Sequence, residues 1–196
     1  LDLMNHQAGF GESTHAYKED IGLTIGEIVA TNQPEQTYEP GTITSYSNFT
    51  AGLAGYIVER VSGQDLSAYI HEHIFQPLGM NDTAMSSDLK DNLKVYKKRM
   101  EALSYQADGQ TSMGNVYFQV GLYPAGNTVS TMGDFQKFAQ ALLKRDKLFK
   151  KAETWETLFT ASSTYPGTDM PLNMHGFWTQ EYGTTVVGHG GNSIGY

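Results

Sequence analysis

The chain contains three consecutive polar residues, Tyr46, Ser47 and Asn48, whose side chains could take part in a chemical reaction. They follow a turn signal at Glu39–Gly41 and directly precede a stretch with helical periodicity. This placement puts a phenol, a hydroxyl and an amide at a helix start, where backbone N–H groups also point outward. A phenol there can transfer a proton, and an amide can hold a substrate carbonyl. These three residues alone favour a purely structural interpretation, in which Ser47 or Asn48 caps the helix and Tyr46 packs.

A second motif is the stretch Gly191–Gly195, which reads G-x-S-x-G with Ser193 at its centre. This is the nucleophile elbow of α/β-hydrolases, and here it follows a predicted strand as that motif should. The α/β-hydrolase fold also needs an acid and a histidine downstream of the serine, and only Tyr196 follows Gly195. Ser193 as a nucleophile is therefore the lesser alternative.

The histidines do not predict a metal site. His71 and His73 flank Glu72, but this spacing puts the two imidazoles on different sides of a helix, unlike the i, i+4 pair that closes on zinc. The isolated histidines His6, His15 and His175 fit surface or capping positions. The chain has no Cys, which excludes thiolate metal sites, disulfides and a cysteine nucleophile. We expect neither a metal nor another cofactor.

Composition and charge describe a globular, acidic chain. The formal net charge of the 196 residues is -8, and the basic clusters are as short as Lys97–Arg99 and Lys150–Lys151, which disfavours nucleic acid as a partner. No apolar run approaches the roughly 18 residues of a membrane span, and no signal peptide opens the chain. We expect one folded unit.

The elements that must position these residues are mostly helices. Capping-box patterns at Thr24 with Glu27 and at Thr131 with Asp134 each predict a helix start. A further helix is predicted to start at Ser47–Asn48 and to stop at Gly63, and another to start at Asp65 and to end at Pro77. The apolar residues expected to face inward are Ile25, Ile28 and Val29; Phe49, Leu53, Ile57 and Val61; Tyr69, Ile70, Ile74 and Phe75; Phe135, Phe138, Leu142 and Leu143; and Trp155, Leu158 and Phe159.

Strand character comes late in the chain. Gly176–Thr179 and Thr184–Val187 flank Glu181–Gly183 and predict a hairpin. Two strands alone are marginally stable, so we expect further strands of the sheet to lie outside the chain, with apolar surface exposed where they would pack. The predicted organisation is one partial domain over 1–196, with a mostly helical region at 1–172 and a hairpin leading into the main sheet at 173–196.

Four blocks of the chain resemble the class C β-lactamase and penicillin-binding-protein-like family of serine hydrolases. The longest is Tyr38–Thr83, which ends in PLGM-x-x-T. Leu3–Gly9 is similar to the family's L-L-x-H-x-S-G segment, with Ala8 in place of the usual Ser. Pro124–Thr131, with Asp134 and Phe138, is similar to its P-A-G-G-x-x-S-T-x-x-D-x-x-x-F segment, and His189–Gly191 to its H-x-G triplet. The blocks keep the family's order and span almost the whole chain.

The resemblance implies an α/β (α+β) fold of the β-lactamase/transpeptidase type, of which the chain holds the helical region and the first strands of the C-terminal half of the antiparallel sheet. In such a fold Tyr46 would be the general base and acid and Asn48 would orient the substrate. His189 would polarise Tyr46 or bind a carboxylate. Gly190 and Gly191 would let substrate lie against the strand. The Asn192 N–H would be one of two oxyanion donors.

The nucleophile of the family is a Ser-x-x-Lys upstream of the L-L-x-H segment, and no such motif precedes Leu3. The one match in the chain, Ser87–Lys90, lies in a predicted solvated loop and fits so loose a pattern by chance. We therefore expect the nucleophile outside the chain, and the chain by itself to be inactive.

The function that follows from the resemblance is a serine acyl-transfer hydrolase in a longer parent protein. Candidates are a D,D-carboxypeptidase, a β-lactamase or a related esterase or peptidase, acting on a β-lactam, a D-Ala-D-Ala-type peptide or an ester outside the cytoplasm. A non-catalytic sensor or peptidoglycan-binding relative of the same fold is the alternative, because the fold itself does not choose. Tyr46 and His189 should converge on one site if the enzyme interpretation holds.

Overall fold

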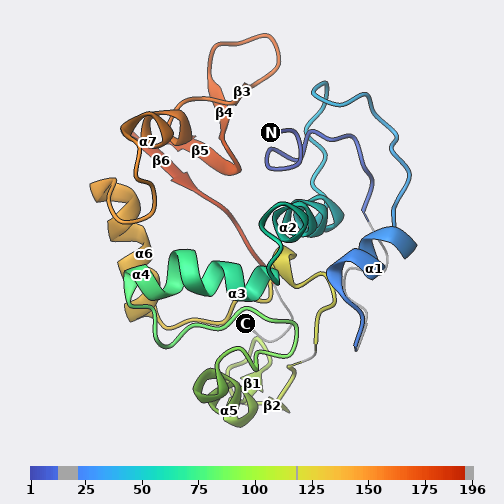
Figure 1. Cartoon of the computed structure of the whole chain (residues 1–196), viewed down its shortest axis with the longest axis vertical. Helices are drawn as coiled ribbons and strands as arrows, with labels where there is room; N and C mark the ends of the chain where they lie inside the picture. The colour runs from blue at the N-terminus through green and yellow to red at the C-terminus, as the bar shows by residue number, and fades with distance from the viewer. Residues whose placement is uncertain (13–21, 118, 193–196) are drawn as a thin grey trace.

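The computed structural model describes residues 1–12, 22–117 and 119–192 of the chain (Figure 1). Its first helices are α1 (Ile25–Thr31), α2 (Asn48–Ser62), α3 (Leu66–Ile70), η1 (His71–Phe75), α4 (Gln76–Leu78) and α5 (Leu93–Glu101). The later helices are η2 (Tyr123–Ala125), α6 (Met132–Lys144) and α7 (Ala152–Leu158). The strands are β1 (Ser104–Tyr105), β2 (Ser112–Gly114), β3 (Ser163–Thr164), β4 (Pro171–Met174), β5 (Phe177–Glu181) and β6 (Thr185–Gly188). None of these helices is long and apolar enough to cross a membrane.

Helix α2 lies at the centre of the helical part, against α1, α3 and η2. Its buried face runs through Phe49, Gly52 and Gly55, whereas Ile57 and Val61 are exposed. The predicted stripe was therefore wrong at its C-terminal end. The reason is close packing at the two glycines, because a Cβ at Gly52 would lie 2.5 Å from Leu122 Cδ2. The core around them comprises Ile25, Ile28, Val29, Phe49, Leu66, Phe75, Leu78, Met80, Met85, Leu122, Tyr123 and Ala141.

The third helical stretch, from α3 to α4, does not end at Pro77, as the sequence predicted, but at Gly79 in the left-handed conformation. The side chain of Asp65 caps its start, as expected. A π-helical turn, η1, precedes the proline, and the Gln76 N–H bonds to the His71 carbonyl five residues back. The wider turn relieves the contact that a proline ring makes with the carbonyl four residues earlier, which allows the helix to continue.

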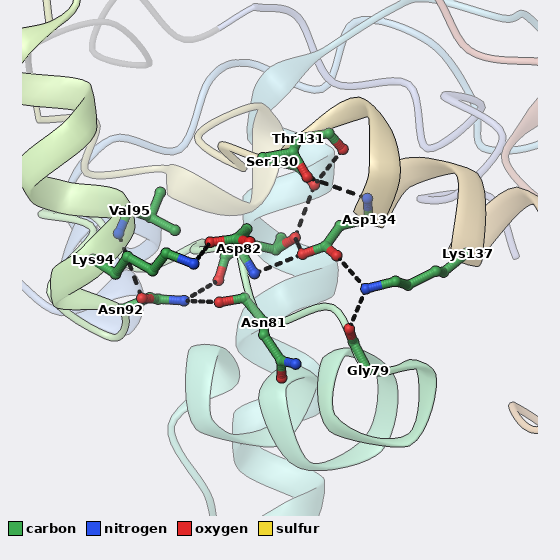
Figure 2. A network of polar contacts seen from close by, with 11 residues as sticks. Gly79, Asn81, Asp82, Asn92, Lys94, Val95, Ser130, Thr131, Asp134 and Lys137 are labelled. Carbon is green, nitrogen blue, oxygen red and sulfur yellow. Dashed lines mark hydrogen bonds and ion pairs between the residues drawn. The ribbon is translucent and has the colours of Figure 1, made fainter.

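The start of α6 is tied to the turn after α4 by a buried carboxylate (Figure 2). Asp134 accepts hydrogen bonds from the Asp82 N–H at 2.6 Å and from the Thr83 hydroxyl at 3.0 Å. Lys137 lies 2.6 Å from Asp134 and also donates to the Gly79 carbonyl. Thr131 caps the helix as predicted. This network fixes two segments of the chain against each other.

The face of α6 was predicted less well than its start. Phe135 is 56% exposed and Leu143 85% exposed, although both were expected to be buried. Phe138, by contrast, packs against the core. Within the described residues, α6 is therefore covered on one side only.

The sheet in the C-terminal part has four antiparallel strands in the order β3-β4-β5-β6. The predicted hairpin is its β5–β6 pair, with Trp178 opposite Gly188 and Glu181 opposite Thr185. The hairpin is not alone, because β3 and β4 extend the sheet back to Ser163, inside the region expected to be helical. Both strands are short, and Pro171 opens β4, so neither has a clear strand signal in the sequence.

The N-terminal segment joins the sheet to the helical part, as the position of the N-terminus in Figure 1 shows. Asn5 is fully buried, and its Oδ1 accepts hydrogen bonds from the Gly176 N–H at 3.3 Å and from the Ser162 hydroxyl at 3.0 Å. The next residue, His6, contacts the start of α2 instead. Two adjacent residues thus reach to opposite parts of the fold.

Candidate active site

The site is built first around the N-terminus of α2. Ser47 is the N-cap residue, but its hydroxyl donates to the Gly11 carbonyl at 2.9 Å and does not cap the helix. The carboxylate of Glu12 accepts hydrogen bonds from the backbone N–H and from the side-chain amide of Asn48, both at 2.9 Å. An anion is stabilised at this end of a helix. Glu12, which no sequence motif singles out, therefore caps α2 in place of Ser47.

Tyr46 and Asn48 form one unit at this helix start. The Tyr46 hydroxyl donates to Asn48 Oδ1 at 3.2 Å, and the Asn48 Nδ2 donates to Glu12. These two bonds fix the orientation of the Asn48 amide, with Oδ1 toward Tyr46 and Nδ2 toward Glu12. The side chain of Tyr46 is half exposed, with 48% of the residue accessible. The phenol is thus held in place and still reachable by a substrate.

His189 reaches the same place from the other end of the chain. It directly follows β6, and its ring centroid lies 6.1 Å from that of Tyr46. Trp178 on β5 lies 6.3 Å from His189, because it stands opposite Gly188 in the sheet register. The expected approach of Tyr46 and His189 is observed in the structure.

His6 completes the group of rings, and the expectation that it is an isolated surface or capping histidine was wrong. It is 6% exposed, and its ring centroid lies 4.4 Å from Tyr46, 5.9 Å from His189 and 6.2 Å from Trp178. Burial lowers the pKa of His6 below its ordinary value of 6.5, and the nearby His189 lowers it further. The signal that could have found His6 was its place in the Leu3–Gly9 block.

Gly190, Gly191 and Asn192 continue from His189 and are exposed. A Cβ built on Gly190 or Gly191 would meet no atom of the described residues within 4 Å, so that part of the structure leaves space beside this segment. The carbonyl of Gly190 lies 2.6 Å from His189 Nδ1, which orients the imidazole. The roles that the resemblance implies for these three residues stay predictions.

The competing motifs find little support in the part of the chain that the structure describes. Ser193 lies outside the described residues. Ser87 lies in a turn, and Lys90 pairs with Asp88 at 3.0 Å, so the Ser-x-x-Lys match is not helical. His71 and His73 are exposed, and across residues 1–12, 22–117 and 119–192 no three His, Asp or Glu side chains gather as metal ligands would.

A family model described as beta-lactamase matches residues 1–196, the whole chain. The chain belongs to the beta-lactamase family. A putative D-alanyl-D-alanine carboxypeptidase of Escherichia coli K12 is 31% identical over 126 residues, which are 60% of this chain and 27% of that protein. The match thus spans about a quarter of the length of that curated relative. The activity of the whole protein is therefore proposed below.

Solved structures of the family give the fold. The D-amino acid amidase of Ochrobactrum anthropi SV3, complexed with L-phenylalanine, matches with a TM-score of 0.70 and 26% identity over 96% of this chain and 55% of that chain. A D-stereospecific amidohydrolase of Streptomyces matches with a TM-score of 0.74 and 22% identity over 98% and 60%. The fold is that of β-lactamases and transpeptidases, as the resemblance implied.

Proposed function

We propose that the whole protein is a serine acyl-transfer hydrolase of the penicillin-recognising type. The observation that carries the proposal is the meeting of Tyr46, fixed by Asn48 at the start of α2, with His189 at the end of β6. A phenol beside an imidazole, half open to solvent, has the parts needed for general acid–base catalysis. The family of carboxypeptidases and amidases supports the same reaction class.

Each residue takes one part in the proposed reaction. A serine of a Ser-x-x-Lys motif, which we place outside these 196 residues, attacks the acyl carbon. Tyr46 accepts the serine proton as the bond to the acyl carbon forms and returns it to the leaving group as the old bond breaks. His189 stabilises the negative charge of the Tyr46 phenolate, which Tyr46 carries before the first of these transfers and again after the second. Asn48, whose Oδ1 holds the Tyr46 hydroxyl, orients the acyl side chain of the substrate, and the Asn192 N–H donates to the oxyanion.

For the substrate we propose an amide, peptide or β-lactam bond next to a D-configured residue. The support comes from relatives named as a D-alanyl-D-alanine carboxypeptidase, a D-amino acid amidase and a D-stereospecific amidohydrolase. A location outside the cytoplasm, where cell-wall peptides are found, belongs to the same proposal. Fractionation of cells with an antibody against the protein tests that location.

The direct test is covalent labelling of the whole protein with a fluorescent penicillin and a fluorophosphonate. We expect an acyl-enzyme, and we expect Tyr46→Phe to lower the labelling rate and kcat/KM on D-amino acid amides by about 10²–10⁴-fold, because general acid–base catalysis has that value. Tyr182→Phe is the matched control, since Tyr182 is an exposed tyrosine whose hydroxyl donates to the neighbouring Gln180 side chain.

Three results would decide against the proposal. Absence of any adduct on the wild-type protein would favour a non-catalytic peptidoglycan-binding relative. Equal loss in Tyr46→Phe and Tyr182→Phe would remove the role of Tyr46. A preference for L-configured over D-configured amides would overturn the substrate class and leave the reaction class standing.

A further inference from the structure

The buried ring of His6 has no part in the reaction proposed above, yet it lies at the centre of the site. Tyr46, His189 and Trp178 all have ring centroids within 6.2 Å of it. Its backbone φ is 55°, in the left-handed region that non-glycine residues rarely adopt. Such strain persists only where the surroundings hold a residue in place, and it is concentrated at functional sites.

His6 holds the residues on both sides of Tyr46. Its backbone carbonyl accepts a hydrogen bond from the Ser45 N–H at 2.8 Å. Its Nδ1 accepts one from the Ser47 N–H at 3.3 Å. Tyr46 is therefore clamped between two backbone groups that the same residue binds, and the imidazole also packs against the phenol ring itself.

These contacts determine the protonation state that the site requires. A backbone N–H can only donate, so Nδ1 of His6 must carry a lone pair where it meets Ser47. The Thr50 hydroxyl lies 3.2 Å from Nδ1 and 2.7 Å from the Ser47 carbonyl, and its one hydrogen can turn to either acceptor, so this contact is compatible with an unprotonated Nδ1. The proton of the neutral ring is thus on Nε2. A second proton, on Nδ1, would place two donors against each other and break the bond to Ser47.

We propose that His6 is a positioning residue which, as the neutral Nε2–H imidazole, clamps the backbone around Tyr46 and aligns the phenol with His189. The kinetic part of this proposal rests on the proposed function, and the structural part does not. Protonation of His6 opens the clamp, so the alignment of Tyr46 is lost in acid.

The charges around His6 set the pH range of this switch. His189 at the end of β6, Glu12 before α2 and Tyr46 at its start are the titratable groups that face it. Burial and His189 lower the pKa of His6, whereas the Ser47 backbone and Glu12 raise it, and the net pKa lies below 6.5. The clamp is therefore closed at neutral pH and opens only as the pH falls below 6.5.

The structural test is ¹⁵N NMR of histidine-labelled whole protein, with the His6 signal assigned by its loss in His6→Asn. We expect Nδ1 without a proton and Nε2 with one at pH 7.5, a midpoint below 6.5, and movement of the Tyr46 ring signals with that midpoint. An Nδ1–H tautomer, or a midpoint at or above 6.5, would overturn the proposal. This readout is independent of whether the protein is a hydrolase.

The kinetic test compares two variants. His6→Gly removes the imidazole and relieves the strained φ, so a loss of activity in this variant reports the loss of the side chain alone. We expect kcat to fall about 10–100-fold with a smaller change in KM, because misplacement of a catalytic group has that effect. His6→Asn should recover most of this loss, since its Oδ1 can accept the Ser47 N–H and asparagine tolerates the left-handed conformation.

The outcomes separate the two proposals. Wild-type kcat in His6→Gly, or equal losses in His6→Gly and His6→Asn, would overturn the positioning role while leaving the hydrolase proposal intact. If the wild-type protein forms no acyl-enzyme, the proposed function fails, and the tautomer and midpoint still decide the clamp. In the wild-type protein, protonation of His6 should contribute to the fall of kcat at low pH. This contribution should be absent from His6→Asn.

Discussion

Tyr46 and His189 lie with their ring centroids 6.1 Å apart, although one precedes α2 and the other follows β6. Residues that act as a unit show non-additive losses when each is changed. We predict that Tyr46→Phe and His189→Asn each lower kcat/KM by about 100-fold or more, and that the double variant loses far less than the product of the two. A double-mutant cycle on the whole protein measures this. Independent, multiplicative losses would mean that the two rings are neighbours without a shared role.

Asp134 should contribute stability that depends on pH. Burial raises the pKa of this carboxyl, but hydrogen bonds from Lys137, the Asp82 backbone and Thr83 hold it below the ordinary 3.8 overall. We predict that Asp134→Asn lowers the free energy of unfolding by about 1–3 kcal/mol at neutral pH, because Lys137 loses its anionic partner and the new amide hydrogens face donors.

The sign of the pH effect follows from the lowered pKa. A carboxyl that is more acidic in the folded state stabilises the fold above its unfolded value of 3.8 and loses that contribution as the pH falls through the folded value. The free energies of unfolding of wild type and Asp134→Asn, measured in urea, should therefore converge as the pH falls below 3.8 and through the lower folded pKa of Asp134. A difference that stays constant from pH 7 to pH 2 would show that charge on Asp134 is not the cause.

The glycines of α2 and α6 should respond in opposite ways to alanine. Gly52→Ala places a methyl group 2.5 Å from the fully buried Leu122, which has no room to move, and should cost about 1–3 kcal/mol of stability. Gly133→Ala is the matched helical control, because its Cβ meets only Thr131 Oγ1, at 3.8 Å. Alanine is a better helix former than glycine by about 0.5–1 kcal/mol. In thermal unfolding, the Tm of Gly133→Ala should therefore be equal to or higher than that of the wild type.

Asn5 should couple the sheet to the helical part. Its Oδ1 accepts from Ser162 and Gly176, so Asn5→Ala removes both hydrogen bonds, although the Ser162 hydroxyl can still donate to the Asn173 carbonyl, and should lower the free energy of unfolding by about 1–3 kcal/mol. The activity of the whole protein should fall as well, because Trp178 on β5 contacts His6 next to Asn5. Asn81→Ala is the control: Asn81 is exposed, and it should stay within about 0.5 kcal/mol of wild type.

Features that depend on neighbours in the sequence were predicted well. The capping box of Thr24 and Glu27, the cap at Asp65 and the stop at Gly63 all formed as expected. Each is a hydrogen bond or a backbone conformation decided within one helical turn. The β5–β6 hairpin formed for the same reason, since its strands are joined by a short turn.

Features that depend on distant packing were missed. Pro77 did not end its helix because the π turn before it absorbs the ring. The strands β3 and β4 are too short to give a pattern; β4 forms by pairing with β5, and β3 forms by pairing with β4. Phe135 and Leu143 fit the helical period of a buried stripe, but period alone does not say which side of a helix finds a partner.

The sequence by itself determined the family and pointed to Tyr46, Asn48 and His189, because ordered blocks of residues carry that information whatever the contacts. Only the tertiary structure decided that His6, Glu12 and Trp178 belong to the same place. Their contacts join residues that the chain keeps far apart, and such contacts form only when the N-terminal segment and the end of the sheet meet at the start of α2. A local pattern cannot encode that meeting, since each side chain by itself fits an ordinary structural position equally well.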